Sequence, residues 1–176
     1  MKDKICFVVQ RYGEEIVGGS ESECRMYAER LVPYYDVEVI TSCAMDHISW
    51  RNDYPEGVSI LNGVTVRRFR TVRERDLKEF SDLSVVLTQK SDHSREEDVD
   101  FEEKQGPMAP EALDWLCEHG SEYKMVLFMT YLYYLAAMGL PRYKGKSLLI
   151  PTAHDEWSVY FPNLPGGVRG RRRLRL

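Results

Sequence analysis

The feature of the sequence that most constrains the fold is a set of short, uninterrupted apolar segments. Residues 5–9 (ICFVV) and 125–129 (MVLFM) have the length of a strand and carry no charged side chain. Such runs are typical of strands inside a parallel sheet, where helices cover both faces. Residues 37–41 and 147–150 are interpreted as further strands of the same sheet. The pattern therefore predicts an α/β protein.

A glycine pair, Gly18 and Gly19, follows the first apolar segment and precedes a predicted helix. Adjacent glycines allow positive φ and leave no Cβ between the backbone amides and a ligand. The turn is therefore a candidate phosphate-binding site at a helix N-terminus. Ser20 and Glu23 have the spacing of a capping box, which predicts that Ser20 caps this helix. The alternative is a glycine turn that only connects a strand to a helix.

The segment after the glycine pair completes a β-α-β unit, because the helical spacing of apolar residues stops at Pro33 and the strand at residues 37–41 follows. Right-handed crossover makes the first two strands parallel neighbours.

A nicotinamide cofactor site is not expected. The glycines lack the G-x-G-x-x-G spacing, and the second strand ends at Ser42 and Cys43 without the carboxylate that would hold the ribose.

A polar loop, residues 44–57, leaves the second strand and contains His47 and Trp50. These two side chains are candidates to contact a sugar or a base, and the favoured alternative is that Trp50 only anchors the loop. Asn62 and Gly63 then predict a tight hairpin turn before a strand at residues 64–69.

The charged residues 71–105 are interpreted as a helical insertion or a mobile loop with a solvated face. Pro110 is expected in the first turn of the next helix, which stops at Gly120. His119, at the end of that helix, is interpreted as a structural residue near the last carbonyls rather than as a ligand.

Polar or aromatic residues follow three of the predicted strands where each strand ends. These three clusters are Gly18-Gly19-Ser20-Glu21, Thr130-Tyr131 and His154-Asp155-Glu156. The carboxyl ends of parallel strands share one edge of a sheet, and a ligand crevice in an α/β protein lies at that edge. The sequence therefore predicts one shared site.

Composition favours one domain, residues 1–162, followed by a basic tail, residues 163–176, that is expected to be disordered. The whole chain has a formal net charge of −4, and the tail holds five arginines within residues 169–176, so the chain without them carries −9. The acidic body argues against nucleic acid as a partner. No segment has the pattern of a signal sequence or a membrane span, so we expect a cytoplasmic protein.

Disulfide, metal and hydrolase sites are not expected. The four cysteines are widely spaced and form no C-x-x-C pair, which predicts reduced thiols and no zinc site. A serine hydrolase would need G-x-S-x-G, but the position of the second glycine is taken by Ser22.

Five features follow one another in the chain: the opening strand, the turn Gly18-Gly19-Ser20-Glu21, the second strand, the Asn62-Gly63 turn and the strand that leads to His154-Asp155. Together they resemble the amino-terminal half of a family 4 glycosyltransferase. The likeness covers residues 4–162, except the charged insertion, and depends on the order and spacing of these features. It implies a GT-B architecture in which this Rossmann-like domain, a doubly wound and mainly parallel sheet flanked by helices, is one of two.

The resemblance also implies roles for individual residues. The turn at Gly18 and Gly19 would approach the donor phosphates, with no metal or other cofactor, and Ser20, Glu21, Thr130, Tyr131 and Glu156 would bind substrate. Many members of the family have a functional histidine where this chain has Thr130 and Tyr131. His154 matches a separate histidine, which together with Asp155 would position hydroxyl groups or transfer a proton. The alternative is that His154 is a structural residue. Retention of anomeric configuration is implied as well.

The resemblance further implies that the partners are a nucleotide sugar, an acceptor and a carboxyl-terminal donor-binding domain. Because such a domain does not follow residue 162, we expect the chain to be a truncated or frame-shifted product, or one subunit of a two-chain transferase, and inactive alone. The alternative is a non-catalytic module that binds nucleotides or glycans. The arginines near Leu174 and Leu176 would give weak contact with an anionic membrane surface, and a tail without a role is the competing expectation.

Overall fold

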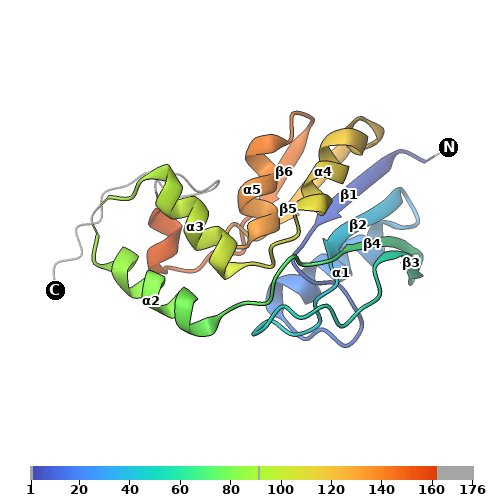
Figure 1. The fold of residues 1–176 in the computed structure, drawn as a ribbon. Helices are drawn as coiled ribbons and strands as arrows, with labels where there is room; N and C mark the ends of the chain where they lie inside the picture. Colours follow the sequence, from blue (N-terminus) through green and yellow to red (C-terminus); the bar gives the residue numbers. More distant parts are fainter. Residues whose placement is uncertain (1, 91, 162–176) are drawn as a thin grey trace.

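The computed structural model describes residues 2–90 and 92–161. They form a six-stranded sheet in the order β3-β4-β2-β1-β5-β6 (Figure 1). The strands are β1 (Lys4–Val8), β2 (Asp36–Ser42), β3 (Gly57–Leu61), β4 (Val64–Phe69), β5 (Met125–Met129) and β6 (Ser147–Ile150). Only the β3–β4 hairpin is antiparallel, and the other neighbours are parallel. The predicted α/β, Rossmann-like architecture is confirmed.

Helices α1 (Gly19–Leu31), α4 (Pro110–His119) and α5 (Tyr134–Arg142) cover the two faces of this sheet. The other helical elements are α2 (Leu77–Thr88), α3 (Arg95–Gln105) and the 3-10 turns η1 (Gly120–Glu122) and η2 (Trp157–Tyr160). Cys24 and Ala28 of α1 pack on one face of the sheet. Residues of α4 and α5 pack on the other face. Two faces buried in this way explain why β5 and residues 5–8 of β1 are wholly apolar.

The charged insertion is helical and forms a lobe made of α2, α3 and η2. Figure 1 shows this lobe at the carboxyl-terminal side of the strands. Asp76 caps α2 through the backbone amides of Lys78 and Glu79, and Ser94 begins α3 with a complete capping box. Leu87 and Phe101 share a small core with η2 and α5.

The predicted capping role of Ser20 is wrong. The N-cap of α1 is Gly18, which makes no side-chain capping bond. Ser20 lies one residue inside the helix, where its Oγ accepts a hydrogen bond from Gln10 (3.1 Å) and donates one to Glu21 (2.9 Å). The physical reason is that Glu21 turns its carboxylate back over Gly18 and draws the serine hydroxyl toward itself.

All four cysteines are free, as predicted, and three of them are buried while Cys117 is exposed. Within the described residues no helix is long and apolar enough to cross a membrane. The predicted basic tail, residues 163–176, lies outside the described residues.

Candidate functional site

The sheet has a topological switch point between β1 and β5. From β1 the chain crosses to β2 on one side, and it later enters β5 on the other side of β1. Val8 of β1 lies opposite Phe128 of β5, so Gln10 and Thr130 follow at the same level at the carboxyl edge. Ligands of open α/β sheets bind at such a point, which makes this edge the candidate site.

Thr130 has a strained backbone at the switch point. Its φ of 66° lies in the left-handed region, which a β-branched residue rarely adopts. Its N–H donates to Ile150 of β6 (2.8 Å), and its buried hydroxyl has no hydrogen-bond partner among the described residues. The side-chain oxygen of Gln10, also buried, likewise has none in this part of the chain. Strained backbone and unpaired polar atoms gather more often at functional sites than elsewhere.

The two glycines of the turn differ in what they permit. Gly18 is extended, with φ of −143°, and a Cβ there would lie 2.3 Å from Oε2 of Glu21. Gly19 also lacks a positive φ, is exposed, and would place a Cβ in open space with no atom within 4 Å. Gly18 is therefore required by the packing of Glu21, whereas nothing within the described residues requires Gly19.

A buried ion pair lies beside the glycine turn. Arg11 donates through Nε (2.9 Å) and Nη2 (2.6 Å) to Oε1 of Glu21, and both side chains are less than one-tenth exposed. Burial opposes ionisation of Glu21, but the charge and hydrogen bonds of Arg11 outweigh it, and the pKa of the carboxyl lies below its ordinary value. The carboxylate of Glu21 is thus an anion already present at the N-terminus of α1, and Arg11 neutralises its charge.

Four loops from the carboxyl edge meet at Trp50, and we call Arg11, Trp50, Arg75 and Tyr133 the Trp50 cluster. Tyr133 contacts the indole edge to face, with ring centroids 5.6 Å apart. The guanidinium carbons of Arg11 and Arg75 lie 5.9 and 4.8 Å from the indole centroid. Trp50 itself is buried and donates to the carbonyl of Gln105 (2.7 Å). The favoured prediction, that Trp50 anchors its loop, agrees with this geometry.

The structure brings together Tyr131 and Glu156, from two of the three predicted clusters. The Tyr131 hydroxyl donates to Glu156 (2.7 Å) and lies 3.0 Å from Oγ of Ser158. Burial raises the pKa of Tyr131, and Glu156 adds to the shift. Tyr131 is almost completely buried, so it serves to hold Glu156 and η2 in place.

His154 and Asp155 lie on the surface after β6. Asp155 accepts a hydrogen bond from Tyr160 (2.7 Å), and the described residues give the His154 imidazole no hydrogen bond. The predicted catalytic roles of these two residues stay predictions.

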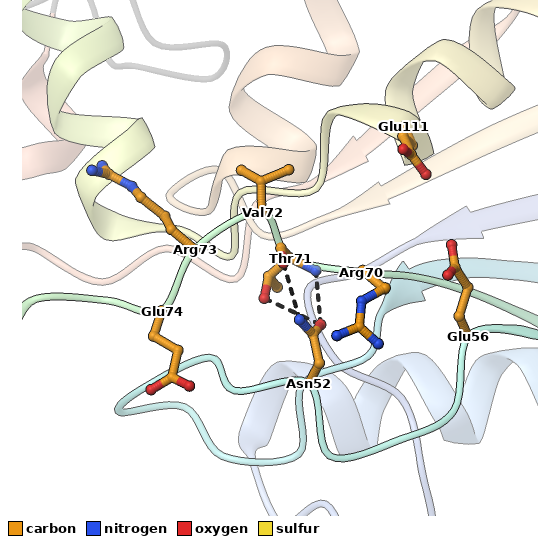
Figure 2. A pocket seen from close by; sticks show the side chains of 8 residues that line it. All are labelled: Asn52, Glu56, Arg70, Thr71, Val72, Arg73, Glu74 and Glu111. Atoms are coloured by element: carbon orange, nitrogen blue, oxygen red, sulfur yellow. Dashed lines mark hydrogen bonds between the residues drawn. The ribbon is translucent and has the colours of Figure 1, made fainter.

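A separate open pocket of about 560 Å³ lies at the carboxyl end of β4, a size typical of small-molecule sites. Its lining residues are Asn52, Glu56, Arg70, Thr71, Val72, Arg73, Glu74 and Glu111. Figure 2 shows Asn52 bonded to Thr71 at the centre, with charged side chains of both signs around them. Three carboxylates and two guanidinium groups favour neither an anion nor a cation, so this pocket does not identify a ligand.

Glu102 of α3 is buried, and within the described residues neither of its carboxylate oxygens has a hydrogen-bond partner. Burial first, and then the charge of Asp98, raise its pKa well above the ordinary value. A carboxyl group with a raised native pKa binds its proton more tightly in the folded chain than in the unfolded chain. The free energy of unfolding must therefore fall as pH rises above the unfolded pKa of about 4.3.

Replacing Glu102 by glutamine is accordingly expected to stabilise the protein at neutral pH, by about 1–3 kcal/mol. The gain over wild type should shrink toward pH 4, where the carboxyl is protonated in both states. Urea unfolding between pH 4 and 8 measures it. Glu118→Gln, the same change at an exposed position of α4, should give no pH-dependent gain, and equal behaviour of the two variants would contradict the assignment.

The sequence interpretation missed Arg11, Arg75 and Tyr133. Arg75 lies in the charge run of residues 71–105, whose pattern predicts a solvated face, and no pattern in the sequence distinguishes Tyr133 from the neighbouring aromatic residues. Arg11 offered a signal, because it follows an apolar strand by two residues and precedes the glycine turn.

No family model, no curated protein and no solved structure matches this chain. Within the described residues, no group of three or more histidine, cysteine or acidic side chains is arranged to hold a metal ion.

Proposed function

We propose that this chain is the acceptor-side, Rossmann-like half of a GT-B glycosyltransferase of the family 4 type. In this proposal it takes part in moving a sugar from a nucleotide-sugar donor to an acceptor, with the ligands meeting at the switch point. Support comes from the fold, from the resemblance of its motifs, and from the geometry of the glycine turn.

The observation that carries the proposal is Gly19. Glycine in the first turn of a helix costs stability relative to alanine, yet at this position neither φ nor crowding requires it. Free space above an exposed backbone at a helix N-terminus is what a phosphate group of a ligand needs for close approach. The missing side chain is therefore explained by a molecule that binds there.

The other roles follow the resemblance. Gly18, Ser20 and Glu21 shape the turn, while His154 and Asp155 reach the sugar or the acceptor. A second, donor-binding domain is required for turnover, and a cytoplasmic location fits a nucleotide-sugar donor. Binding of a nucleotide sugar without turnover in any assembled form would favour the alternative, a non-catalytic binding module.

The test is a matched pair of alanine variants titrated calorimetrically with a panel of nucleotide sugars. Gly19→Ala should lower the affinity of the best ligand at least tenfold, because the new methyl group occupies the space of the phosphate, and Tm should stay equal or rise. Ser22→Ala, at an exposed position in the same helix, should leave affinity unchanged.

Two results would overturn the proposal. One is that no nucleotide sugar binds to the folded wild-type chain. The other is that Gly19→Ala binds as tightly as wild type, since the glycine would then have no ligand to accommodate.

A further inference from the structure

We propose that Arg75 and Tyr133 form a binding site for a phosphate ester beside the N-terminus of α1. Both side chains pack on Trp50, Arg75 from the loop between β4 and α2 and Tyr133 from the loop between β5 and α5. The site would hold the phosphate through a guanidinium group and a phenol hydroxyl, in addition to any contact that the glycine turn makes.

Arg75 is a half-buried cation that forms no ion pair with the described residues. Among these residues its guanidinium donates only to main-chain carbonyls, through Nε (2.8 Å) and Nη2 to Gln105 and through Nη1 (3.2 Å) to His47. Burial lowers the pKa of Arg75 to about 10, and electrostatic interaction with Tyr133 and Asp46 offsets this only in part. A bound anion would supply the missing counter-charge.

The carbonyl of Gln105 receives more donors than it can satisfy. Trp50 Nε1 (2.7 Å) and two nitrogens of Arg75 all point to this one oxygen, whereas a carbonyl oxygen has two lone pairs. A guanidinium has five N–H donors in a fixed plane. The carbonyls of Gln105 and His47 take up three of them, so one N–H on each of Nη1 and Nη2 remains for a ligand. These bonds and the stacking on Trp50 hold the guanidinium in position.

Tyr133 supplies a second donor, because its ring packs on the same indole as Arg75. Its ring is half-buried, and within the described residues its hydroxyl makes no hydrogen bond. Burial raises the pKa of Tyr133, the charges of Glu21 and Glu156 add to the shift, and those of Arg75 and Arg11 oppose it. The phenol is thus a neutral donor that lies among these four charged groups at the carboxyl edge.

The Trp50 cluster contains a positive charge without an ion-pair partner among the described residues. Arg11 and Glu21 neutralise each other, whereas Arg75 forms no such pair and interacts with the charge of Asp46 only at longer range. A guanidinium fork is a typical receptor for phosphate oxygens.

This inference rests on the proposed function for the identity of the ligand, a phosphate-bearing substrate, but its test does not. The first probe is inorganic pyrophosphate, titrated into ¹⁵N-labelled protein at low salt while the indole N–H signal of Trp50 is followed. Binding should move this signal, because a pyrophosphate bound to the Arg75 guanidinium brings negative charge close to the Trp50 ring on which that guanidinium stacks. Arg75→Gln and Tyr133→Phe should each weaken binding, by at least tenfold and severalfold respectively.

The matched control is Arg73→Gln, which removes the same charge from the same loop. Arg73 is exposed and lies 3.8 Å from Glu79, so its loss should change affinity less than twofold. Equal losses in Arg73→Gln and Arg75→Gln would overturn the proposal, as would absence of any shift at millimolar pyrophosphate. If Arg75→Gln does not fold, Tyr133→Phe decides alone, because it deletes only a hydroxyl that bonds to no described residue.

Uridine diphosphate and glycerol 3-phosphate then distinguish a donor diphosphate from an acceptor phosphomonoester, by which of them binds with Arg75-dependent affinity. Pyrophosphate binding that depends on Arg75 without binding of any nucleotide sugar would keep the phosphate site and reject the glycosyltransferase. Nucleotide-sugar binding that Arg75→Gln and Tyr133→Phe leave unchanged would keep the glycosyltransferase and reject the phosphate site.

Discussion

Replacing Arg11 by methionine is expected to lower the free energy of unfolding by about 3–5 kcal/mol, the cost of leaving one member of a buried ion pair without its partner. The side chain of Glu21 is only 6% exposed, so water cannot replace the guanidinium. Its remaining side-chain partner is the Ser20 hydroxyl, which is too weak to stabilise a charge in that position. Urea unfolding at pH 7 gives the difference.

The pH dependence of this loss has a defined sign. The pKa of Glu21 is lowered in the folded chain, so the ion pair contributes fully above the unfolded pKa of about 4.3, and its contribution is lost as pH falls through the folded pKa. The deficit of Arg11→Met should therefore shrink in acid.

Two further variants check the interpretation of the Arg11 result. The double variant Arg11→Met, Glu21→Met should recover most of the stability, because a buried pair can be replaced by apolar side chains at little cost. Lys78→Met, which breaks an exposed pair with Asp82, should cost less than about 1 kcal/mol. A deficit in Arg11→Met that persists in the double variant would show that the loss comes from packing rather than from charge.

The elements of the fold were predictable because their signals are local. Uninterrupted apolar runs identified β1 and β5, the Asn62-Gly63 turn located the β3–β4 hairpin, and Pro110 marked the first residue of α4. Parallel pairing followed from the handedness of crossovers. The start of α1 was misplaced because the competing interaction, the turn of Glu21 toward Arg11, connects residues ten positions apart.

The chemistry of the site was only partly predictable, because it is made by contacts between loops. Nothing near Arg75 in the sequence indicates that its guanidinium stacks on Trp50 and binds the carbonyl of Gln105. Likewise the strain at Thr130 depends on how β5 leaves the sheet beside β6. The glycine pair was recognisable, but only the packing separates a structural Gly18 from a Gly19 that the structure does not require.

Glu38 is another buried carboxylate, and it interrupts the apolar residues of β2. It lies in the middle of β2, its side chain is 1% exposed, and it accepts from Lys4 (2.8 Å) and Arg67 (2.6 Å).

The Arg67 guanidinium stacks 3.9 Å from Trp115. Trp115 in turn stacks on His119, which bonds to Glu122. Because Lys4 also contacts Glu122, these groups close a ring that ties β1, β2, β4 and α4 together.

Glu38→Gln should therefore lower the free energy of unfolding by about 3 kcal/mol, near the lower limit for breaking a buried pair. The cost stays near that limit because Lys4 and Arg67, with side chains 27% and 21% exposed, keep some contact with water. Urea unfolding followed by tryptophan fluorescence measures it.

Glu122→Gln, the same change at the half-exposed end of the ring, should cost less than about 1 kcal/mol. In a double-mutant cycle, Glu38→Gln and Arg67→Met should couple by more than about 1 kcal/mol, and additive losses would mean that the two side chains stabilise the sheet independently.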